Sequence, residues 1–452
     1  NGSALALAHN VIVVTVSYRL GALGFLPLAD FPGEGSGGMN GMHDVVVGLK
    51  WLRANVGHFG GAPADVTLFG QSSGGYLTCT LCVSHAARGL FRRAILESGP
   101  CVGGPPGRGW GPATLARGLN VSAQVMAAHN VSDLAGLRAI ANASTIQWPD
   151  ALMNDPSVAP YFSGYFDDEA VAVGPLERHW AAGEINPSSL LVGTTSKDGT
   201  SAFYGTAPTL GNVAPDARQV GQAAYTRALR AAWGNATAAA VAAQYPLARF
   251  NGSAQAAFIQ ADADAYVICP SLSIATHASR SGRSVWKFEF AHFQPGRPGT
   301  TNISGGGCDN GVELDVVSPV EGRGLPSNGW ATHGADTSFV FGTTRAPDGL
   351  GPPDVETVCP FNAEEARLSA TMMAYWANFA TTADPNGAAT ATRRAGSGLQ
   401  WPSYTQAARW PTQMLWTESD GGVGPVRGLH TADCAFWGRL WSNQDAAGVA
   451  IA

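Results

Sequence analysis

The chain has 452 residues, of which 45% are hydrophobic and 13% are charged, and its formal net charge is −6. This composition is too apolar for a disordered chain and supplies enough material for a large core. The negative charge provides no basic surface for nucleic acid or an anionic membrane. No continuous apolar run approaches the roughly 20 residues of a transmembrane helix. We therefore expect a soluble globular protein without a nucleic-acid partner or a transmembrane segment.

Short apolar or β-branched runs alternate with helical patterns along the chain. Strands are predicted at residues 11–16, 66–69, 94–96, 190–192 and 285–290, and helices at residues 45–56, 76–83 and 216–243. Several of the runs are almost wholly apolar, as are strands buried on both faces of a parallel sheet. The pattern predicts an α/β fold with a mostly parallel central sheet flanked by helices.

Three stretches rich in Gly and Pro interrupt this alternation, at residues 99–112, 294–307 and 345–353. We interpret them as surface insertions between elements and not as linkers between independent domains. Because α/β enzymes often form one long domain, residues 1–452 are predicted to be a single domain.

A serine lies between the strand predicted at residues 66–69 and the helix predicted at residues 76–83, in the sequence Gly70-Gln71-Ser72-Ser73-Gly74. This strand, turn and helix pattern is typical of a nucleophile elbow, in which a serine occupies a strained, exposed turn. Glycines two residues before and two after the serine are expected because strand and helix must approach closely. The alternative interpretation is a glycine-rich loop that happens to contain a serine.

A serine nucleophile needs a base and an acid. In α/β folds that carry a nucleophile elbow, these residues follow the serine in the chain order Ser, acid, His. Asp198 follows the run at residues 190–192, and catalytic residues of open parallel sheets lie just past the carboxyl ends of strands. An Asp-Gly pair is also typical of an ordinary turn. Of the ten histidines, His333 comes after the last sheet-like run, so chain order favours it as the base, although most histidines are surface or core residues.

Cysteines and asparagines indicate the compartment. The seven cysteines are compatible with an oxidising environment. Cys79 and Cys82 lie three residues apart on a predicted helix without a second pair nearby, so we interpret them as buried small side chains and expect no metal site. Seven asparagines lie in Asn-x-Ser/Thr sequons, more than this composition predicts by chance: Asn1, Asn120, Asn130, Asn142, Asn235, Asn251 and Asn302. The excess favours a glycosylated, secreted protein.

Together these motifs resemble the type-B carboxylesterase family, which includes carboxylesterases, cholinesterases, fungal lipases and the non-enzymatic neuroligins. The resemblance is carried by residues 17–26, 59–75, 333–336, 376–379, 384–386 and 401–404, nearly end to end. It implies the α/β-hydrolase fold, with Ser72 as nucleophile, Asp198 as triad acid, His333 as general base and the N–H of Ser73 as an oxyanion-hole donor.

The same resemblance implies a disulfide between Cys269 and Cys434, whose sequence contexts are similar to those of a family bridge. Cys308 and Cys359 are a second candidate pair. The chain contains no His-Gly-Gly-Gly-like segment before residues 11–16, so it is expected to lack the N-terminal portion of the family domain, and with it the other oxyanion donors. Cys101 is expected to be free or bonded to that portion.

Three positions depart from the family's pattern. Gln71 and Asp198 stand where the family usually has Glu, and Ala62 stands where it usually has Asp. Aspartate is one methylene shorter than glutamate, so the loop or the imidazole must compensate, although the fold accepts either acid.

We therefore predict a secreted serine carboxylic-ester hydrolase that acts on a small-molecule or lipid-like ester through an acyl-enzyme intermediate, without a cofactor or metal. The alternatives are a catalytically silent, neuroligin-like binding ectodomain, and a cholinesterase or lipase within the same family.

Overall fold

The computed structural model describes residues 2–29, 37–103, 115–142, 145–146, 171, 175–199, 221–292, 331, 333–343, 361–387, 399–405, 412–416 and 423–447. The chain divides into two compact units. The serine unit comprises Thr15–Leu190, Cys269–Arg283 and Ala435–Ala452, and the acid–base unit comprises Asn1–Val14, Leu191–Ile268 and Ser284–Cys434. Each unit is assembled from segments far apart in the sequence. The single domain over residues 1–452 stays a prediction.

The strands form a mostly parallel sheet, as predicted. In the serine unit, β1 (Thr67–Gln71) pairs with β2 (Arg93–Glu97) in parallel, with Phe69 opposite Ile95. In the acid–base unit, β4 (Ser284–Phe290) pairs with β5 (Thr412–Trp416) in parallel, and β5 pairs with β6 (Gly424–Arg427) antiparallel. The strand β3 (Ser189–Thr195) begins in the serine unit and continues in the acid–base unit, and the strand order is β1-β2-β3-β4-β5-β6.

Four of the five predicted strands correspond to β1, β2, β3 and β4. The prediction for residues 11–16 is wrong, because no strand of the described residues includes them. A β-branched run becomes a strand only when a neighbour accepts its backbone hydrogen bonds. Here the side chains of Ile12, Val14 and Val16 stay 47%, 43% and 36% exposed.

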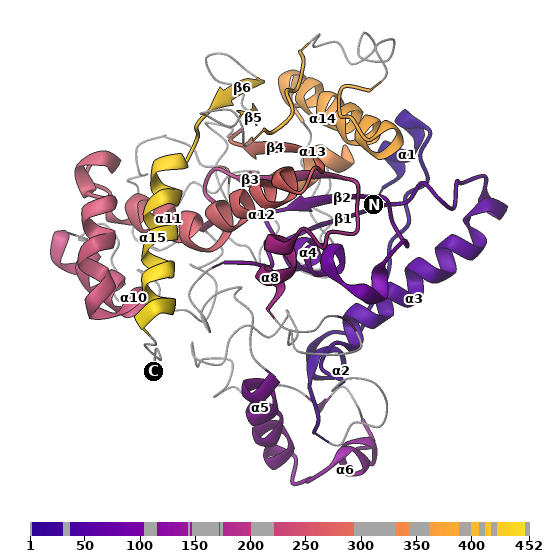
Figure 1. Ribbon diagram of the computed structural model, residues 1–452, viewed down its shortest axis with the longest axis horizontal. Helices are drawn as coiled ribbons and strands as arrows, with labels where there is room; N and C mark the ends of the chain where they lie inside the picture. Colours follow the sequence, from indigo (N-terminus) through magenta and orange to yellow (C-terminus); the bar gives the residue numbers. More distant parts are fainter. Residues whose placement is uncertain are drawn as a thin grey trace. The chain divides into compact units, whose positions relative to one another are not determined.

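Helices of the serine unit cover its strands. α4 (Ser73–Val83) packs against β1 and β2, as Figure 1 shows, and every residue from Gly75 to Val83 is buried. The helix predicted at residues 45–56 corresponds to α3 (Asn40–Asn55). The other helices of this unit are α2 (Gly21–Phe25), η1 (Val56–Phe59), η2 (His85–Ala87), α5 (Leu115–Ala128), α6 (Leu134–Arg138), α8 (Leu176–Ala182) and α12 (Cys269–Arg280).

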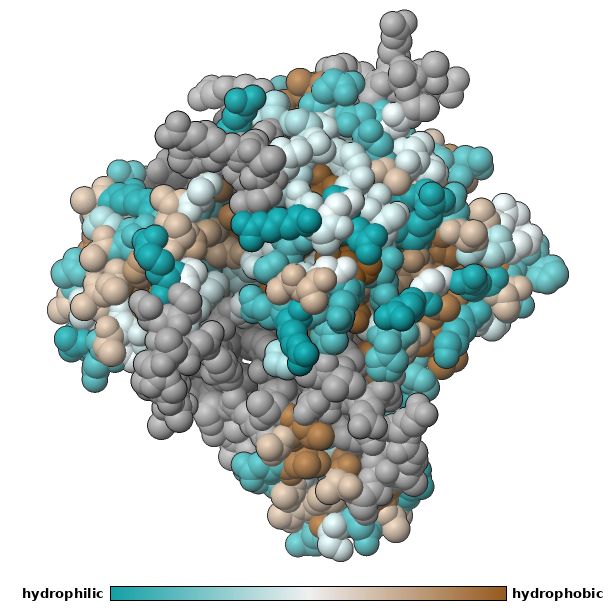
Figure 2. Space-filling view, in the orientation of Figure 1, coloured by the Kyte–Doolittle hydropathy of each residue, from teal (hydrophilic) through white to brown (hydrophobic). Residues whose placement is uncertain are grey.

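A small core lies apart from the strands of this unit. Val121 and Val125 of α5 and Leu137 of α6 bury against Leu26 and its neighbours. On the face shown in Figure 2, apolar residues gather over α5 and α6, where side chains packed on this core stay partly exposed.

The acid–base unit contains α1 (Ser3–His9), α10 (Gln222–Gln244), η6 (Leu247–Phe250), α11 (Ala254–Ala263), the π-helical turn η7 (Asp264–Ile268), α13 (Thr337–Phe341) and α14 (Ala363–Thr382). α15 (Thr431–Ala447) begins in this unit and continues in the serine unit. The helix predicted at residues 216–243 corresponds to α10, which is interrupted at Gly234, where φ is 75°.

Aromatic packing fixes β4 within this unit. Phe288 contacts Trp376 of α14 and Trp401 edge-on, with ring centroids 4.9 and 6.1 Å away. Trp286 contacts Phe379 of α14 in the same way at 5.9 Å. Such pairs add about 0.5–1.5 kcal/mol each beyond the area that they bury. Among the described residues, no helix is long and apolar enough to cross a membrane.

Candidate active site

Ser72 occupies the turn between β1 and α4, as the sequence predicts. Its backbone has φ 57° and ψ −123°, a conformation that a residue with a Cβ seldom adopts and that costs about 1–3 kcal/mol. Two backbone hydrogen bonds hold it: the Ser72 N–H donates to the Glu97 carbonyl at 2.9 Å, and the Tyr76 N–H donates to the Ser72 carbonyl at 2.9 Å. This geometry is that of a nucleophile elbow.

The close approach of strand and helix depends on a different set of glycines from the one the motif suggests. A Cβ on Gly70 would lie 2.3 Å from the carbonyl C and O of Gly74, so the motif's first glycine is required. Among the described residues, a Cβ on Gly74 would meet no heavy atom within 4 Å outside its own helix, so these residues do not require the glycine predicted here. Gly75 and Gly99 are required instead: their Cβ atoms would lie 2.8 Å from the Glu97 carbonyl O and 2.3 Å from the Ser72 carbonyl O. Sequence reasoning missed both because their contacts are with distant segments.

Ser73 is the first residue of α4. Its N–H therefore belongs to the first helical turn, whose N–H groups have no carbonyl partner within the helix and can bind negative charge. The side chain of Ser73 is hydrogen bonded to Tyr18, and burial raises the pKa of the Tyr18 hydroxyl while this bond acts in the opposite direction. These contacts fit an oxyanion donor at Ser73, which stays a prediction.

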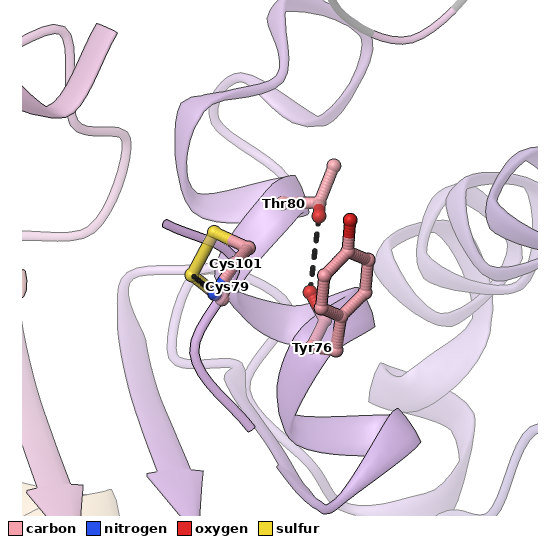
Figure 3. Close-up of a disulfide and its surroundings, with 4 residues drawn as sticks. All are labelled: Tyr76, Cys79, Thr80 and Cys101. Atoms are coloured by element: carbon pink, nitrogen blue, oxygen red, sulfur yellow. Dashed lines mark hydrogen bonds between the residues drawn. A yellow bond between two sulfur atoms is a disulfide. The ribbon is translucent and has the colours of Figure 1, made fainter. Parts of the chain in front are cut away.

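A disulfide joins α4 to the loop that follows β2. Cys79 on α4 is bonded to Cys101, and both are fully buried (Figure 3). The expectations for Cys79 as a plain apolar side chain, and for Cys101 as free or bonded to a preceding segment, are therefore wrong. Cys82 is a buried free thiol, and burial raises the pKa of that thiol. Cys101 lies two residues after Gly99, so the disulfide fixes the loop that packs against Ser72.

In the acid–base unit, His333 and Asp198 form a hydrogen-bonded pair. The Nδ1 of His333 lies 2.8 Å from the Oδ1 of Asp198, and the other oxygen, Oδ2, accepts a hydrogen bond from the Thr195 N–H at 2.7 Å. The Asp198 side chain is fully buried and that of His333 is 14% exposed. An imidazole oriented in this way by a buried carboxylate is the acid–base half of a serine hydrolase triad.

The loops that carry these two residues are joined directly. The Lys197 N–H donates to the Ala331 carbonyl at 3.0 Å, so the residue before Asp198 binds the chain two residues before His333. Two glycines shape the loops. A Cβ on Gly199 would lie 2.2 Å from the Ile259 carbonyl of α11, and Gly334 has a φ of 83°. The shorter aspartate therefore reaches the imidazole from a loop held tightly against α11.

His333 does not follow the last strand of the sheet, as the sequence suggested, because β5 and β6 come after it. Chain order nevertheless selected the histidine that binds Asp198. Ser72 lies in the serine unit, whereas Asp198 and His333 lie in the acid–base unit. The catalytic roles of all three stay predictions.

A cluster of buried charges that the sequence did not reveal lies beside the acid loop. The ring nitrogens of His430 face Glu289 at 2.6 Å and Asp264 at 3.1 Å. Although burial opposes the charged form, Glu289 and Asp264 raise the pKa of His430 to about 10. The imidazole is thus a cation at neutral pH, and its charge balances part of this buried acidic cluster.

Three side chains of this region could in principle hold a metal ion. Among the described residues, only Asp264, His430 and Asp433 place His, Cys, Asp or Glu ligand atoms within 4.8 Å of one another in a group of three or more. Arg249 binds both oxygens of Asp433 at 2.8 and 2.7 Å, and Gln244 donates to the same carboxylate. A cation would have to displace these bonds, so the group is an ion-pair cluster.

The remaining predicted sites that the structure describes lie at the surface or in disulfides. Five of the sequon asparagines are exposed: Asn120, Asn130, Asn142, Asn235 and Asn251. Asn1, Asn302, Cys308 and Cys359 lie outside the described residues. Cys269 and Cys434 each take part in a disulfide, and their pairing with each other stays a prediction.

A sequence profile described as "Carboxylesterase family" matches residues 1–437. Cocaine esterase of Homo sapiens is 28% identical over 447 residues, which cover 97% of this chain and 68% of that protein. Para-nitrobenzyl esterase of Bacillus subtilis is 27% identical, over 90% of this chain and 70% of that protein. Acetylcholinesterase of Bungarus fasciatus is 28% identical, over 97% of this chain and 65% of that protein.

Solved structures show the same fold. A thermophilic PNB esterase and a PNB esterase each align with a TM-score of 0.68, at 23% and 24% identity. Each alignment covers 97% of this chain, and 76% and 77% of the two esterase chains. The chain therefore has the α/β-hydrolase fold that its sequence predicts.

Proposed function

Because the chain belongs to the carboxylesterase family, a family of serine carboxylic-ester hydrolases, we propose that it hydrolyses esters through a Ser72, His333 and Asp198 triad and an acyl-enzyme intermediate. The observation that carries the proposal is the hydrogen bond between His333 Nδ1 and the buried carboxylate of Asp198. The elbow geometry of Ser72 supports it independently.

In this mechanism the Ser72 hydroxyl attacks the ester carbonyl while His333 accepts its proton. Since Asp198 binds Nδ1, the Nε2 atom is the one left to act as the base, and the carboxylate stabilises the imidazolium that forms. The Ser73 N–H donates to the oxyanion of the tetrahedral intermediate. His333 then returns the proton to the leaving alcohol, and water releases the acyl group by the same steps.

A substrate series tests the proposal directly. The purified protein is offered p-nitrophenyl esters with acyl chains from acetate to laurate, and is also treated with a fluorophosphonate that labels active serines. We expect hydrolysis and labelling in the wild type, and a loss of several orders of magnitude in turnover in Ser72→Ala. Ser403→Ala is the matched control, because it removes the hydroxyl of an exposed serine to which no role in the site is assigned.

A folded protein that neither hydrolyses the series nor takes the label would support the alternative, a catalytically silent binding ectodomain. Unchanged hydrolysis in Ser72→Ala would refute the triad. A large preference for butyrylthiocholine over an uncharged thioester of equal length would support the cholinesterase alternative, and a preference for long acyl chains the lipase alternative.

We also propose that the protein is extracellular and glycosylated. The buried Cys79–Cys101 disulfide and the exposed sequon asparagines support this, since both are typical of proteins that pass through an oxidising secretory compartment. Treatment with an N-glycosidase is expected to lower the mass of the protein from its native source and to convert occupied asparagines to aspartates.

A further inference from the structure

The chain contains only three lysines, Lys50, Lys197 and Lys287, and two of them lie beside the triad acid. Lys50 is exposed on α3. Lys197 directly precedes Asp198, and Lys287 on β4 is fully buried, with its ammonium 3.3 Å from the Thr194 hydroxyl. Burial lowers the pKa of both groups, and that of Lys287 falls to about 8. Placing ammonium groups here costs free energy, which the bonds that they make must offset.

The backbone of Lys197 connects the acid loop with the base loop. Its N–H donates to the Ala331 carbonyl, and the preceding N–H, of Ser196, donates to the Phe290 carbonyl at 2.9 Å. The Ser196 bond joins the end of β3 to the last residue of β4, and the Lys197 bond joins the acid loop to the loop that carries His333. The position of residue 197 therefore influences where both Asp198 and His333 lie.

The side chain of Lys197 ends on α11. Its Nζ donates to the Oε1 of Gln260 at 2.6 Å, and Gln260, which is 4% exposed, donates through Nε2 to Asp264 at 3.1 Å. Asp264 also accepts from the Tyr245 hydroxyl at 2.9 Å and faces the Nδ1 of His430. Lys197 is therefore anchored to a buried network whose members are already hydrogen bonded, so Gln260 is a firm attachment point.

α11 contacts the acid loop on both sides of Asp198. Gln260 binds residue 197 from one side, and the backbone of Ile259 and Ala263 packs against Gly199, where a Cβ would lie 2.2 and 2.7 Å from those two residues. Asp198 is the one residue between these two contacts. A triad aspartate, with its short side chain, depends more than a glutamate would on such a fixed backbone.

We propose that Lys197 is a positioning residue for ester hydrolysis, whose ammonium, through Gln260, fixes the acid loop so that Asp198 stays hydrogen bonded to His333. This inference rests on the proposed function. In this role the ammonium of Lys197 binds Gln260 and not the substrate, so its removal should weaken the base without altering substrate binding.

The test compares Lys197→Met, Gln260→Leu and their double variant, with Lys50→Met as the matched control at the exposed lysine. Since a displacement of about 1 Å can cost about 10²-fold in rate, we expect kcat to fall about 10- to 100-fold in each single variant with KM unchanged. The double variant should be no worse than Gln260→Leu alone, because both substitutions break the bond between Lys197 and Gln260, and Gln260→Leu also removes the bond to Asp264. Lys197→Arg should recover most of the activity, and Lys50→Met should retain all of it.

A second readout does not depend on turnover. The far-downfield proton resonance of the His333 Nδ1–H, which reports its bond to Asp198, should broaden or move upfield in Lys197→Met and Gln260→Leu. A purely structural role would lower the melting temperature and leave this resonance and kcat unchanged. If Lys197→Met does not fold, Gln260→Leu carries the same test.

Folded variants with wild-type kcat and an unchanged resonance would overturn the proposal, as would strictly additive losses in the double variant. The proposed function fails separately. If the wild type hydrolyses no ester, the resonance alone decides whether Lys197 positions the Asp198 and His333 pair.

Discussion

Exchange of Gly70 for alanine should damage the elbow, whereas the same exchange at Gly74 should not. Neither glycine has a positive φ, so alanine is not strained by the backbone at either position, and the main difference is the space around the added methyl group. At position 70 that methyl carbon would lie 2.3 Å from two backbone atoms of Gly74, and ordinary contact begins near 3.4 Å. Because backbone cannot rotate away as a side chain can, β1 and α4 must separate by about 1 Å.

Such overpacking typically costs about 1–3 kcal/mol of stability, and a 1 Å displacement of a nucleophile can cost about 10²-fold in rate. We therefore expect Gly70→Ala to lose at least 1 kcal/mol and about 10²-fold in kcat. At Gly74, inside α4, the described residues leave room for a methyl group, so Gly74→Ala should keep its activity and gain about 0.5–1 kcal/mol, because alanine favours the helix more than glycine does.

Urea unfolding followed by tryptophan fluorescence gives the stability difference, and initial rates on p-nitrophenyl butyrate give kcat. Fluorophosphonate labelling of Ser72 reports on the elbow independently of the substrate. Equal behaviour of the two variants, or a greater loss in Gly74→Ala, would show that the close approach of strand and helix does not determine the position of Ser72.

Three further outcomes are expected. Replacing both Cys79 and Cys101 by alanine should lower the unfolding free energy by about 3 kcal/mol, the chain-entropy value for a loop of this length. A loss below about 1 kcal/mol in urea unfolding would show that the disulfide does not stabilise the fold. Cleavage of the unreduced protein on the C-terminal side of each lysine should leave peptides 198–287 and 288–452 linked through Cys269 and Cys434. A free thiol at either cysteine in the peptide map would refute that pairing. The pKa of His430 is raised to about 10 in the folded state, whereas the unfolded chain releases this proton above about pH 6.5. The bound proton therefore contributes fully to stability below pH 6.5, and this contribution is lost as the pH rises towards 10. The unfolding free energy should therefore decrease more between pH 7 and pH 9 in the wild type than in His430→Gln. An equal decrease in the two proteins would rule the effect out.

Local patterns carried most of what the sequence could predict. The turn at Ser72 is specified within a few residues, by an apolar run, the motif and a helix, and it forms as expected. Asp198 and His333 were placed by chain order and resemblance, and their hydrogen bond is present. What escaped prediction depends on distant partners. Gly99 is needed only because its loop approaches Ser72, and the connectivity of cysteines cannot be derived from their spacing.

The short strands β5 and β6 show the same limit. β6 begins with Gly-Pro and alternates between partly buried and exposed residues, so it reads as a loop until a neighbouring strand is known. Residues 11–16 show the reverse: a strong β-branched pattern does not form a strand here, since no strand of the described part of the chain pairs with it.

The disulfide behind the elbow also determines how the chain responds to mechanical force. Cys79 and Cys101 are 22 residues apart in the sequence, and the ring that they close includes the end of α4 and all of β2. When the unfolded chain is stretched between its ends, this ring cannot extend, which hides about 70–80 Å of contour length. A reductant that reaches the stretched chain would release that length in one step, so a pulling experiment can count the bond in a single molecule.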